Sequence, residues 1–157
     1  MIKLIDEKVM AETASKALAS PRLRMNYNYH ELSDPVQRML NAIEPESYIR
    51  PHRHKNPDKT EMFIVLKGRG VVVIFDNEGN VVEHYLMEAG GNTLAVEIPP
   101  GVWHSIFSLD KATVFLEVKD GPYAAISDKG FASWSPVPDD SEAAKKYLER
   151  LRASLGY

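Results

Sequence analysis

The chain of 157 residues contains no cysteine. This absence excludes disulfide bonds, cysteine-ligated zinc and a catalytic thiol, so a bound metal would have to be held by nitrogen and oxygen atoms. The sequence also lacks long hydrophobic runs. The N-terminal residues carry charges where a signal peptide needs an apolar core, and no later segment approaches the length of a membrane span. We therefore expect a cytoplasmic protein without a membrane partner.

Neither sign of charge dominates the sequence. The 19 Lys and Arg residues are scattered among 22 Asp and Glu residues, which leaves a net charge of -3. A domain that binds DNA or RNA normally carries a basic patch, so we expect no nucleic-acid partner. The length suits one domain with a sizeable core, and we predict a single domain over residues 1–157.

Apolar residues at helical spacing predict three helices. The first covers residues 6–20. A second, short helix would start at Ser33-Asp34-Pro35 and carry an apolar stripe as far as Ile43. The last is an amphipathic helix over about residues 139–155, preceded by a capping sequence.

Short strands separated by turn residues fill the rest of the chain, a pattern typical of an all-β sandwich or barrel. Asn77-Glu78-Gly79-Asn80 and Leu109-Asp110-Lys111 resemble hairpin turns, and Gly68 marks a tight corner that needs a positive φ. An irregular stretch rich in aromatic residues and prolines, over residues 121–138, would cover the barrel. The predicted strands lie at about residues 2–5, 22–30, 47–54, 61–67, 70–76, 80–88, 93–98, 103–109 and 112–119.

Two histidines separated by one residue form the first candidate site. Side chains two apart on a strand point to the same face, so His52 and His54 would project together with Cα atoms roughly 7 Å apart. Glu61 opens the next apolar run, and a strand paired with the first would bring its carboxylate beside the imidazoles. By itself, a His-x-His pair is as often a pair of surface histidines. His84, which has no such neighbour, is expected to be an ordinary surface residue.

A third histidine follows a rigid turn. Pro99-Pro100-Gly101 fixes the direction of the backbone, so the side chain of His104 can be aimed in advance. Three imidazoles and one carboxylate suit one divalent transition metal, such as zinc, iron, manganese, nickel or copper, with open positions for water or substrate. We therefore predict a metal site made of His52, His54, Glu61 and His104.

Cationic and polar side chains near these residues predict a pocket for a small anionic ligand. Arg50 lies two residues before His52 and would share its strand face, where a guanidinium favours a carboxylate or phosphate. The polar face of the strand at 22–30 either forms the rim of the same pocket or is a solvated edge face. The candidate ligand-binding residues are Arg50, Arg22, Arg24, Asn28 and His30.

The first group of these residues resembles a motif of the cupin superfamily. That motif has the form Gly-x5-His-x-His-x(3 or more)-Glu-x6-Gly, and this chain matches it with His52, His54, Glu61 and Gly68. Two features depart from it. The opening glycine is absent, and six residues separate His54 from Glu61 where three or four are usual. The longer insert affects the expected pose of Glu61 and leaves the histidines unchanged.

The second cupin motif is also present. It has the form Gly-x5-Pro-x-Gly-x-x-His-x3-Asn and is matched by Pro99, Gly101 and His104, whereas Ser108 stands in place of the asparagine. The resemblance implies a mainly β cupin fold, that is, a double-stranded β-helix or jelly-roll barrel. Its core would cover about residues 22–125, with N-terminal helices and a C-terminal amphipathic helix around it.

More narrowly, the chain resembles the WbuC-family cupin-fold metalloproteins over about residues 15–125. This resemblance implies a metal-binding cupin of the kind often associated with bacterial surface-polysaccharide loci, whose reaction is not established. Because cupins commonly pair, it also implies a homodimer. The shared segments are Pro21-Arg22-x-Arg24, Asn28-x-His30, Gln37-Arg38-Met39 and Tyr48-x-Arg50-Pro51-His52-Arg53-His54.

Several functions are compatible with such a site. The leading hypothesis is a metal-dependent isomerase or epimerase for a small, oxygen-rich anion, with the metal as Lewis acid and Glu61 as a fourth ligand or a base. A metal-dependent oxygenase is the enzymatic alternative, because two histidines and one carboxylate can hold iron(II). A non-catalytic binding module is a third, since no acid–base pair is evident beyond the ligands. A metal-free cupin epimerase is the last.

Overall fold

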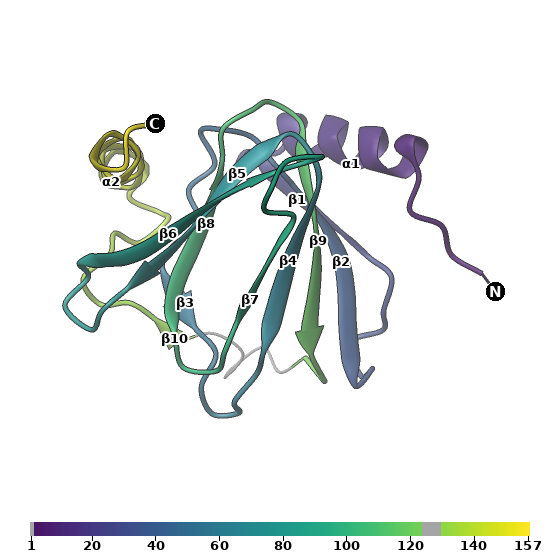
Figure 1. Cartoon of the computed structure of the whole chain (residues 1–157), viewed down its shortest axis with the longest axis horizontal. Coiled ribbons are helices and arrows are strands. Elements are labelled where there is room, and N and C mark those ends of the chain that lie inside the picture. Colours follow the sequence, from purple (N-terminus) through teal and green to yellow (C-terminus); the bar gives the residue numbers. More distant parts are fainter. Residues whose placement is uncertain (1, 124–129) are drawn as a thin grey trace.

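The computed structural model describes residues 2–123 and 130–157, which form two five-stranded sheets with every strand pair antiparallel (Figure 1). The first sheet has the order β1 (Arg24–Asn28), β2 (Val36–Ile43), β9 (Thr113–Asp120), β4 (Glu61–Lys67) and β7 (Ala95–Ile98). The second has the order β10 (Gly130–Phe131), β3 (His52–Arg53), β8 (Trp103–Ser108), β5 (Arg69–Phe75) and β6 (Val81–Glu88). The predicted mainly β class is confirmed.

Helix α1 (Glu7–Ala19) covers the outer face of the first sheet. The side chain of Asp6 accepts a hydrogen bond from the backbone N–H of Val9, which satisfies one of the free donors at the start of the helix. Its buried face presents small side chains, so the helix can approach the sheet closely. The contact joins Met10, Ala14 and Ala17 to Leu40, Ala42 and Val114.

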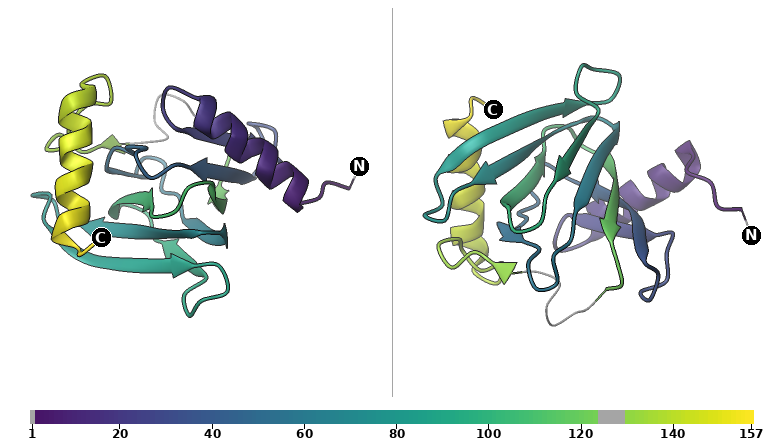
Figure 2. Two further views of the ribbon diagram at one scale, coloured as in Figure 1. Left: turned by 90° about the horizontal axis from the view of Figure 1, so that it is seen from above. Right: turned by 60° about the horizontal axis from the view of Figure 1, so that its bottom comes forward.

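Helix α2 (Ser141–Ser154) covers the outer face of the second sheet, on the opposite side of the molecule (Figure 2). Asp140 caps it by accepting from the N–H of Ala143. The predicted amphipathic face is confirmed, because Ala144, Leu148 and Leu151 pack against apolar residues of β5 and β8. Neither α1 nor α2 is long and apolar enough to cross a membrane.

Between the sheets lies an apolar core that fills one part of the interior. Phe63 and Phe115 from the first sheet meet edge to face at 6.5 Å and pack with Val72 and Ile106 from the second. Phe63 and Val65, two residues apart on β4, both point into this core. The rest of the interior is polar and contains the candidate site.

The segment predicted as a second helix is strand β2 instead. Its residues are buried on both faces: Leu40 and Ala42 lie under α1, while Asn41 and Ile43 point between the sheets. A strand covered on both sides carries a nearly continuous apolar run, and here that run imitates helical spacing. The expected helix start is a turn, in which Asp34 accepts a hydrogen bond from Arg38 at 2.8 Å.

Three shorter predictions also differ from the structure. Residues 2–5 form no strand, although the Leu4 carbonyl accepts from the hydroxyl of Tyr29 at 2.9 Å. The strand expected at 47–54 is limited to β3. Residues Leu109 to Lys111 form no hairpin, because they connect β8 in one sheet to β9 in the other. The part of the predicted cover at 124–129 lies outside the described residues.

Two predicted turns are confirmed. Gly68, at the corner between β4 and β5, has a φ of +74°, and an added Cβ would come within 2.5 Å of the Thr113 hydroxyl oxygen. Glycine is required there for both reasons. The β5–β6 hairpin closes where the N–H of Asp76 donates to the carbonyl of Asn80 at 3.0 Å, with Gly79 at a φ of +91°.

The packing of α2 predicts a measurable difference between two leucines. Leu148 is 6% exposed against the second sheet, whereas Leu18 in α1 is 63% exposed. Leu148→Ala leaves a cavity and should lower the free energy of unfolding by about 2–5 kcal/mol. Leu18→Ala, the matched control, should change it by less than about 0.5 kcal/mol. Urea unfolding of both variants measures this, and equal losses would contradict the docked position of α2.

Candidate metal centre

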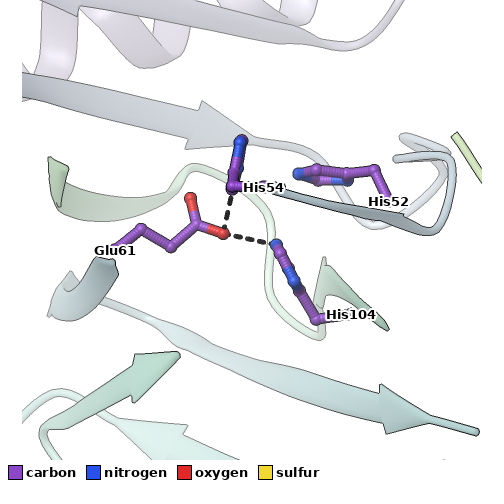
Figure 3. A group of neighbouring side chains, drawn as sticks. All are labelled: His52, His54, Glu61 and His104. Atoms are coloured by element: carbon purple, nitrogen blue, oxygen red, sulfur yellow. Dashed lines mark ion pairs between the residues drawn. The ribbon is translucent and has the colours of Figure 1, made fainter. Parts of the chain in front are cut away.

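Four side chains predicted as metal ligands lie together between the two sheets (Figure 3). They are His52, His54, Glu61 and His104, all buried, and each offers one ligand atom within 4.8 Å of the others. A divalent transition metal binds imidazole nitrogen and carboxylate oxygen at about 2.0–2.2 Å, so atoms this close can share one ion. The sequence prediction of the cluster therefore agrees with the structure.

Strand pairing brings two of the histidines together. His52 on β3 is directly opposite His104 on β8, and their ring centroids lie 4.4 Å apart. His54 follows the end of β3, and its carbonyl accepts a hydrogen bond of 2.9 Å from the N–H of Gly101. Gly101 has a φ of +78° in the Pro-Pro-Gly turn. The turn thus ties the loop that carries His54 to the strand that carries His104.

Glu61 reaches the histidines from the opposite sheet. It is the first residue of β4, which pairs with β7 and β9, and Glu61 itself lies opposite Ile98 and Lys119. The expectation that this strand pairs with the His-x-His strand is therefore wrong. The carboxylate therefore reaches the histidines across the gap between the two sheets.

Backbone carbonyls set the orientation of two imidazoles. Nδ1 of His52 lies 2.9 Å from the carbonyl oxygen of Arg50, and Nδ1 of His104 lies 2.9 Å from that of Val102. Because a carbonyl oxygen can only accept, each Nδ1 must carry a proton, and in the neutral ring Nε2 then has a lone pair. This arrangement is typical of metal-binding histidines, whose second nitrogen is held by an outer hydrogen bond.

Glu61 is held as a carboxylate. Its Oε1 lies 3.4 Å from Nε2 of His54 and is in closer contact with Nε2 of His104. Burial alone raises the pKa of the Glu61 carboxyl, yet His104, followed by His54 and His52, holds that pKa well below its usual range. That lowering requires positive charge between the carboxylate and the imidazoles, either a proton on an imidazole nitrogen or, with neutral rings, a metal ion in its place.

A cavity of about 430 Å³ opens beside the cluster, with His52 and Glu61 in its wall. A volume of this size suits a small organic molecule. Its apolar wall includes Phe63, Ile106 and Phe131. Its polar and charged wall includes Arg22, Arg24, Asn26, Asn41, Arg50, Glu117 and Asp139.

Three of the arginine and polar residues predicted to bind a ligand line this cavity. Arg22 lies at its rim and is exposed. Arg24 is partly buried and donates from Nη1 to the carbonyl of Tyr48 at 2.9 Å. Burial and the neighbouring charge of Arg22 lower the pKa of Arg24 to about 10, so the guanidinium stays charged at neutral pH. Arg50 completes the cationic part of the wall.

Arg50 is engaged by the segment that closes the cavity. Its Nη2 donates to the carbonyl of Ala132 at 2.9 Å, and its Nε donates to the hydroxyl of Ser135 at 3.2 Å. Its guanidinium also lies 5.3 Å from the ring centroid of Phe131. Arg50 precedes β3, and its side chain lines the same cavity as His52. It anchors the cover and adds positive charge beside the metal cluster.

Asn28 and His30 do not line the cavity. Asn28 is exposed at the end of β1. His30 is buried, and its Nδ1 lies 2.9 Å from both the N–H nitrogen and the carbonyl oxygen of Arg38, which fixes the hairpin between β1 and β2. A ligand-binding role for these residues stays a prediction.

Sequence reasoning missed four polar residues of the cavity wall: Asn26, Asn41, Glu117 and Asp139. Asn41 was hidden by the incorrect helix. The signal for Glu117 was available, because residues 113, 115, 117 and 119 alternate with the apolar residues that face α1. Period-two alternation in β9 places a carboxylate on the same interior face as Phe115.

Comparison with known families gives one match. Residues 5–87 match a family described as a domain of unknown function, DUF6016. The chain belongs to DUF6016. No protein of curated function matches the sequence. The matched residues cover α1, β1 to β5 and all but the last residue of β6, and they include three of the four clustered residues. The description of the family names no activity.

Solved structures show that this DUF6016 chain has a cupin fold. CapF, the capsular polysaccharide assembling protein of Staphylococcus aureus, is 23% identical over 71% of this chain, with a TM-score of 0.57. The chain spans only 30% of that CapF chain. Oxalate oxidase in complex with the substrate analogue glycolate is 18% identical over 88% of this chain and 75% of its own, with a TM-score of 0.54. KdgF from Halomonas sp. is 14% identical over 67% and 84%, with a TM-score of 0.52.

The contacts of Arg50 predict that it stabilises the cover of the cavity. Arg50→Met removes its hydrogen bonds to Ala132 and Ser135 and should lower the free energy of unfolding by about 1–3 kcal/mol. Arg150→Met, on the exposed side of α2, is the control and should have little effect. Guanidinium unfolding measures both. An unchanged stability for Arg50→Met would show that the guanidinium does not hold this segment.

Proposed function

We propose that this protein is a metal-binding cupin in which His52, His54, His104 and Glu61 hold one divalent transition metal. The observation that carries the proposal is the pair of carbonyl hydrogen bonds at Nδ1 of His52 and His104. In the neutral rings they leave Nε2 as the metal-binding nitrogen, and the four ligand atoms lie within 4.8 Å of one another in a buried site. The donor set fits zinc, iron, manganese or nickel, and its three nitrogens and one oxygen do not select among them.

We further propose that the site is catalytic and that its substrate is a small, oxygen-rich anion. Such a metal would supply Lewis-acid chemistry, which favours isomerisation or epimerisation beside a carbonyl group. Glu61 would serve as the fourth ligand or would accept a proton. The guanidinium groups of Arg22 and Arg50 give the cavity positive charge for a carboxylate or phosphate.

A carbohydrate-related substrate, in surface-polysaccharide metabolism, is supported by two likenesses. The first is the resemblance to the WbuC family, which includes Tyr48-x-Arg50-Pro51-His52-Arg53-His54. The second is the similarity in fold to CapF, a capsular polysaccharide assembling protein. Both are consistent with a polar cavity of about 430 Å³ beside the histidines.

Two other functions keep specific support. An oxygenase is compatible with two histidines and one carboxylate around iron(II). A non-catalytic binding module is compatible with the contacts of Arg50, whose Nε and Nη2 already donate to the cover segment. Oxygen uptake by iron-loaded protein, measured with a panel of sugars and organic acids, distinguishes the oxygenase from the isomerase. Rapid uptake with any of them would replace the isomerase proposal by the oxygenase.

Metal content tests the proposed site directly. Protein purified without added metal should contain about one metal ion per chain by elemental analysis. His52→Ala and His104→Ala should retain less than about a tenth of it, since a lost ligand strongly lowers metal affinity. His84→Ala is the matched control, because His84 is exposed on β6 and lies outside the cluster.

Thermal melting of the same variants separates a catalytic metal from a structural one. With a catalytic metal, the metal-poor variants should remain folded and melt cooperatively. A large decrease of the melting temperature in both variants would indicate that the metal mainly stabilises the barrel. Wild-type metal content in both variants would contradict the proposed ligands.

A further inference from the structure

A second carboxylate faces the cavity beside the metal cluster. Glu117 on β9 is 8% exposed and lines the same cavity as Glu61 on β4. In the register of these strands Glu61 lies opposite Lys119, and Phe63 lies opposite Glu117. Glu61 and Glu117 are therefore diagonal neighbours on one interior face, with Cα atoms about 7–8 Å apart. The metal cluster and the second carboxylate can contact one small molecule.

Side-chain amides hold this carboxylate in a fixed orientation. Oε2 of Glu117 accepts a hydrogen bond of 2.6 Å from Nδ2 of Asn41. Oδ1 of Asn41 in turn accepts from Nδ2 of Asn26, its cross-strand partner. Oε1 of Glu117 lies 3.7 Å from Nζ of Lys119. Each amide donates toward Glu117, and the charged carboxylate is the final acceptor of the network, with capacity for a further donor from the cavity.

The position of this network is costly for the fold. Asn41 and Glu117 come from adjacent strands and are each 8% exposed on the interior face, where neighbouring positions carry Ile43, Phe63 and Phe115, whereas Asn26 is exposed on the edge strand β1. Burying a carboxylate requires compensating partners, and an apolar side chain of similar size would stabilise the barrel as well or better. A polar wall at this place is therefore explained by what enters the cavity.

We propose that the cavity binds a polyhydroxylated carboxylate, a compound of the sugar-acid class, and that Glu117 accepts a hydrogen bond from a hydroxyl group remote from the metal. The assignment rests on the proposed metal site. The carboxylate end of the ligand would lie by the metal cluster and the arginines, and a hydroxyl farther along its chain would donate to Glu117. Charged acceptors discriminate strongly against a ligand that lacks the donor.

Two six-carbon acids test this assignment. Gluconate and 2-hydroxyhexanoate both carry a carboxylate and an adjacent hydroxyl that can bind a metal, but only gluconate has hydroxyls farther along the chain. Isothermal titration calorimetry of metal-loaded wild-type protein should show gluconate binding at least about tenfold more tightly. Glu117→Gln should reduce this preference to within about twofold, with metal content and 2-hydroxyhexanoate affinity unchanged.

The control variant is Glu97→Gln, an exposed position on β7 outside the cavity, which should keep the wild-type preference for gluconate.

Glu117→Asp provides a second test if Glu117→Gln does not melt cooperatively. It keeps the charge beside Lys119 but withdraws the carboxylate by one methylene, so it should also lose the preference for gluconate. Circular dichroism melting establishes which variants are folded.

The outcomes separate the two proposals. Wild-type protein that binds no metal would contradict the proposed function. Metal-loaded protein that binds both acids equally, or neither of them, would contradict the sugar-acid assignment and leave the metal site intact. If Glu117→Gln and Glu117→Asp lost affinity for gluconate and for 2-hydroxyhexanoate equally, the assignment would also be overturned. Glu117 would then support the site without contacting the remote hydroxyl.

Discussion

The structure depends on placing three imidazoles and one carboxylate, all buried, between its two sheets. Each group would lose favourable hydration on burial, and the loss is tolerable only if fixed partners replace the water. The carbonyls of Arg50 and Val102 accept hydrogen bonds from Nδ1 of His52 and His104, and Nε2 of His104 lies against the Glu61 carboxylate. The proposed metal ion would be the cation that these groups share.

Each of the two sheets supplies different residues of this site. The second sheet carries His52 and His104 as a direct cross-strand pair, and the turn at Gly101 fixes His54 beside them. The first sheet supplies Glu61 and the polar wall at Glu117. Helices α1 and α2 bury the outer faces, so the fold does not need the whole interior for its apolar core. The unused part of the interior becomes the cavity.

The cluster was predictable from the sequence because its information is local. A His-x-His pair, a carboxylate at the start of a strand and a histidine after a rigid turn are visible in short segments, and the four residues do lie together. What joins them was not visible. Strand pairing between distant segments decides that Glu61 crosses from the other sheet, and no local pattern contains that information. The strands from β4 to β9 were predicted well, since alternation and turns set their limits.

The incorrect helix has a clear physical cause. Burial on both faces removes the alternation that identifies a strand, so the sequence of β2 was interpreted as a helix. For the same reason Asn41 was not recognised as a residue of the site. Arg50 was assigned by strand spacing, but it precedes β3 and its donors hold Ala132 and Ser135. Asn28 and His30 belong to the same polar stripe as Arg22, Arg24 and Asn26, but they do not line the cavity, and their ligand-binding role stays a prediction. The expected homodimer stays a prediction, because subunit contacts do not follow from one chain.

The most direct test of the metal site is anomalous X-ray diffraction from crystals of protein purified without added metal. Data collected on both sides of the absorption edge of the metal found by fluorescence locate that metal alone. The account predicts one strong anomalous peak at about 2.0–2.2 Å from Nε2 of His52, His54 and His104. A cluster without such a peak, with the carboxylate of Glu61 bonded only to a protonated imidazole, would contradict it.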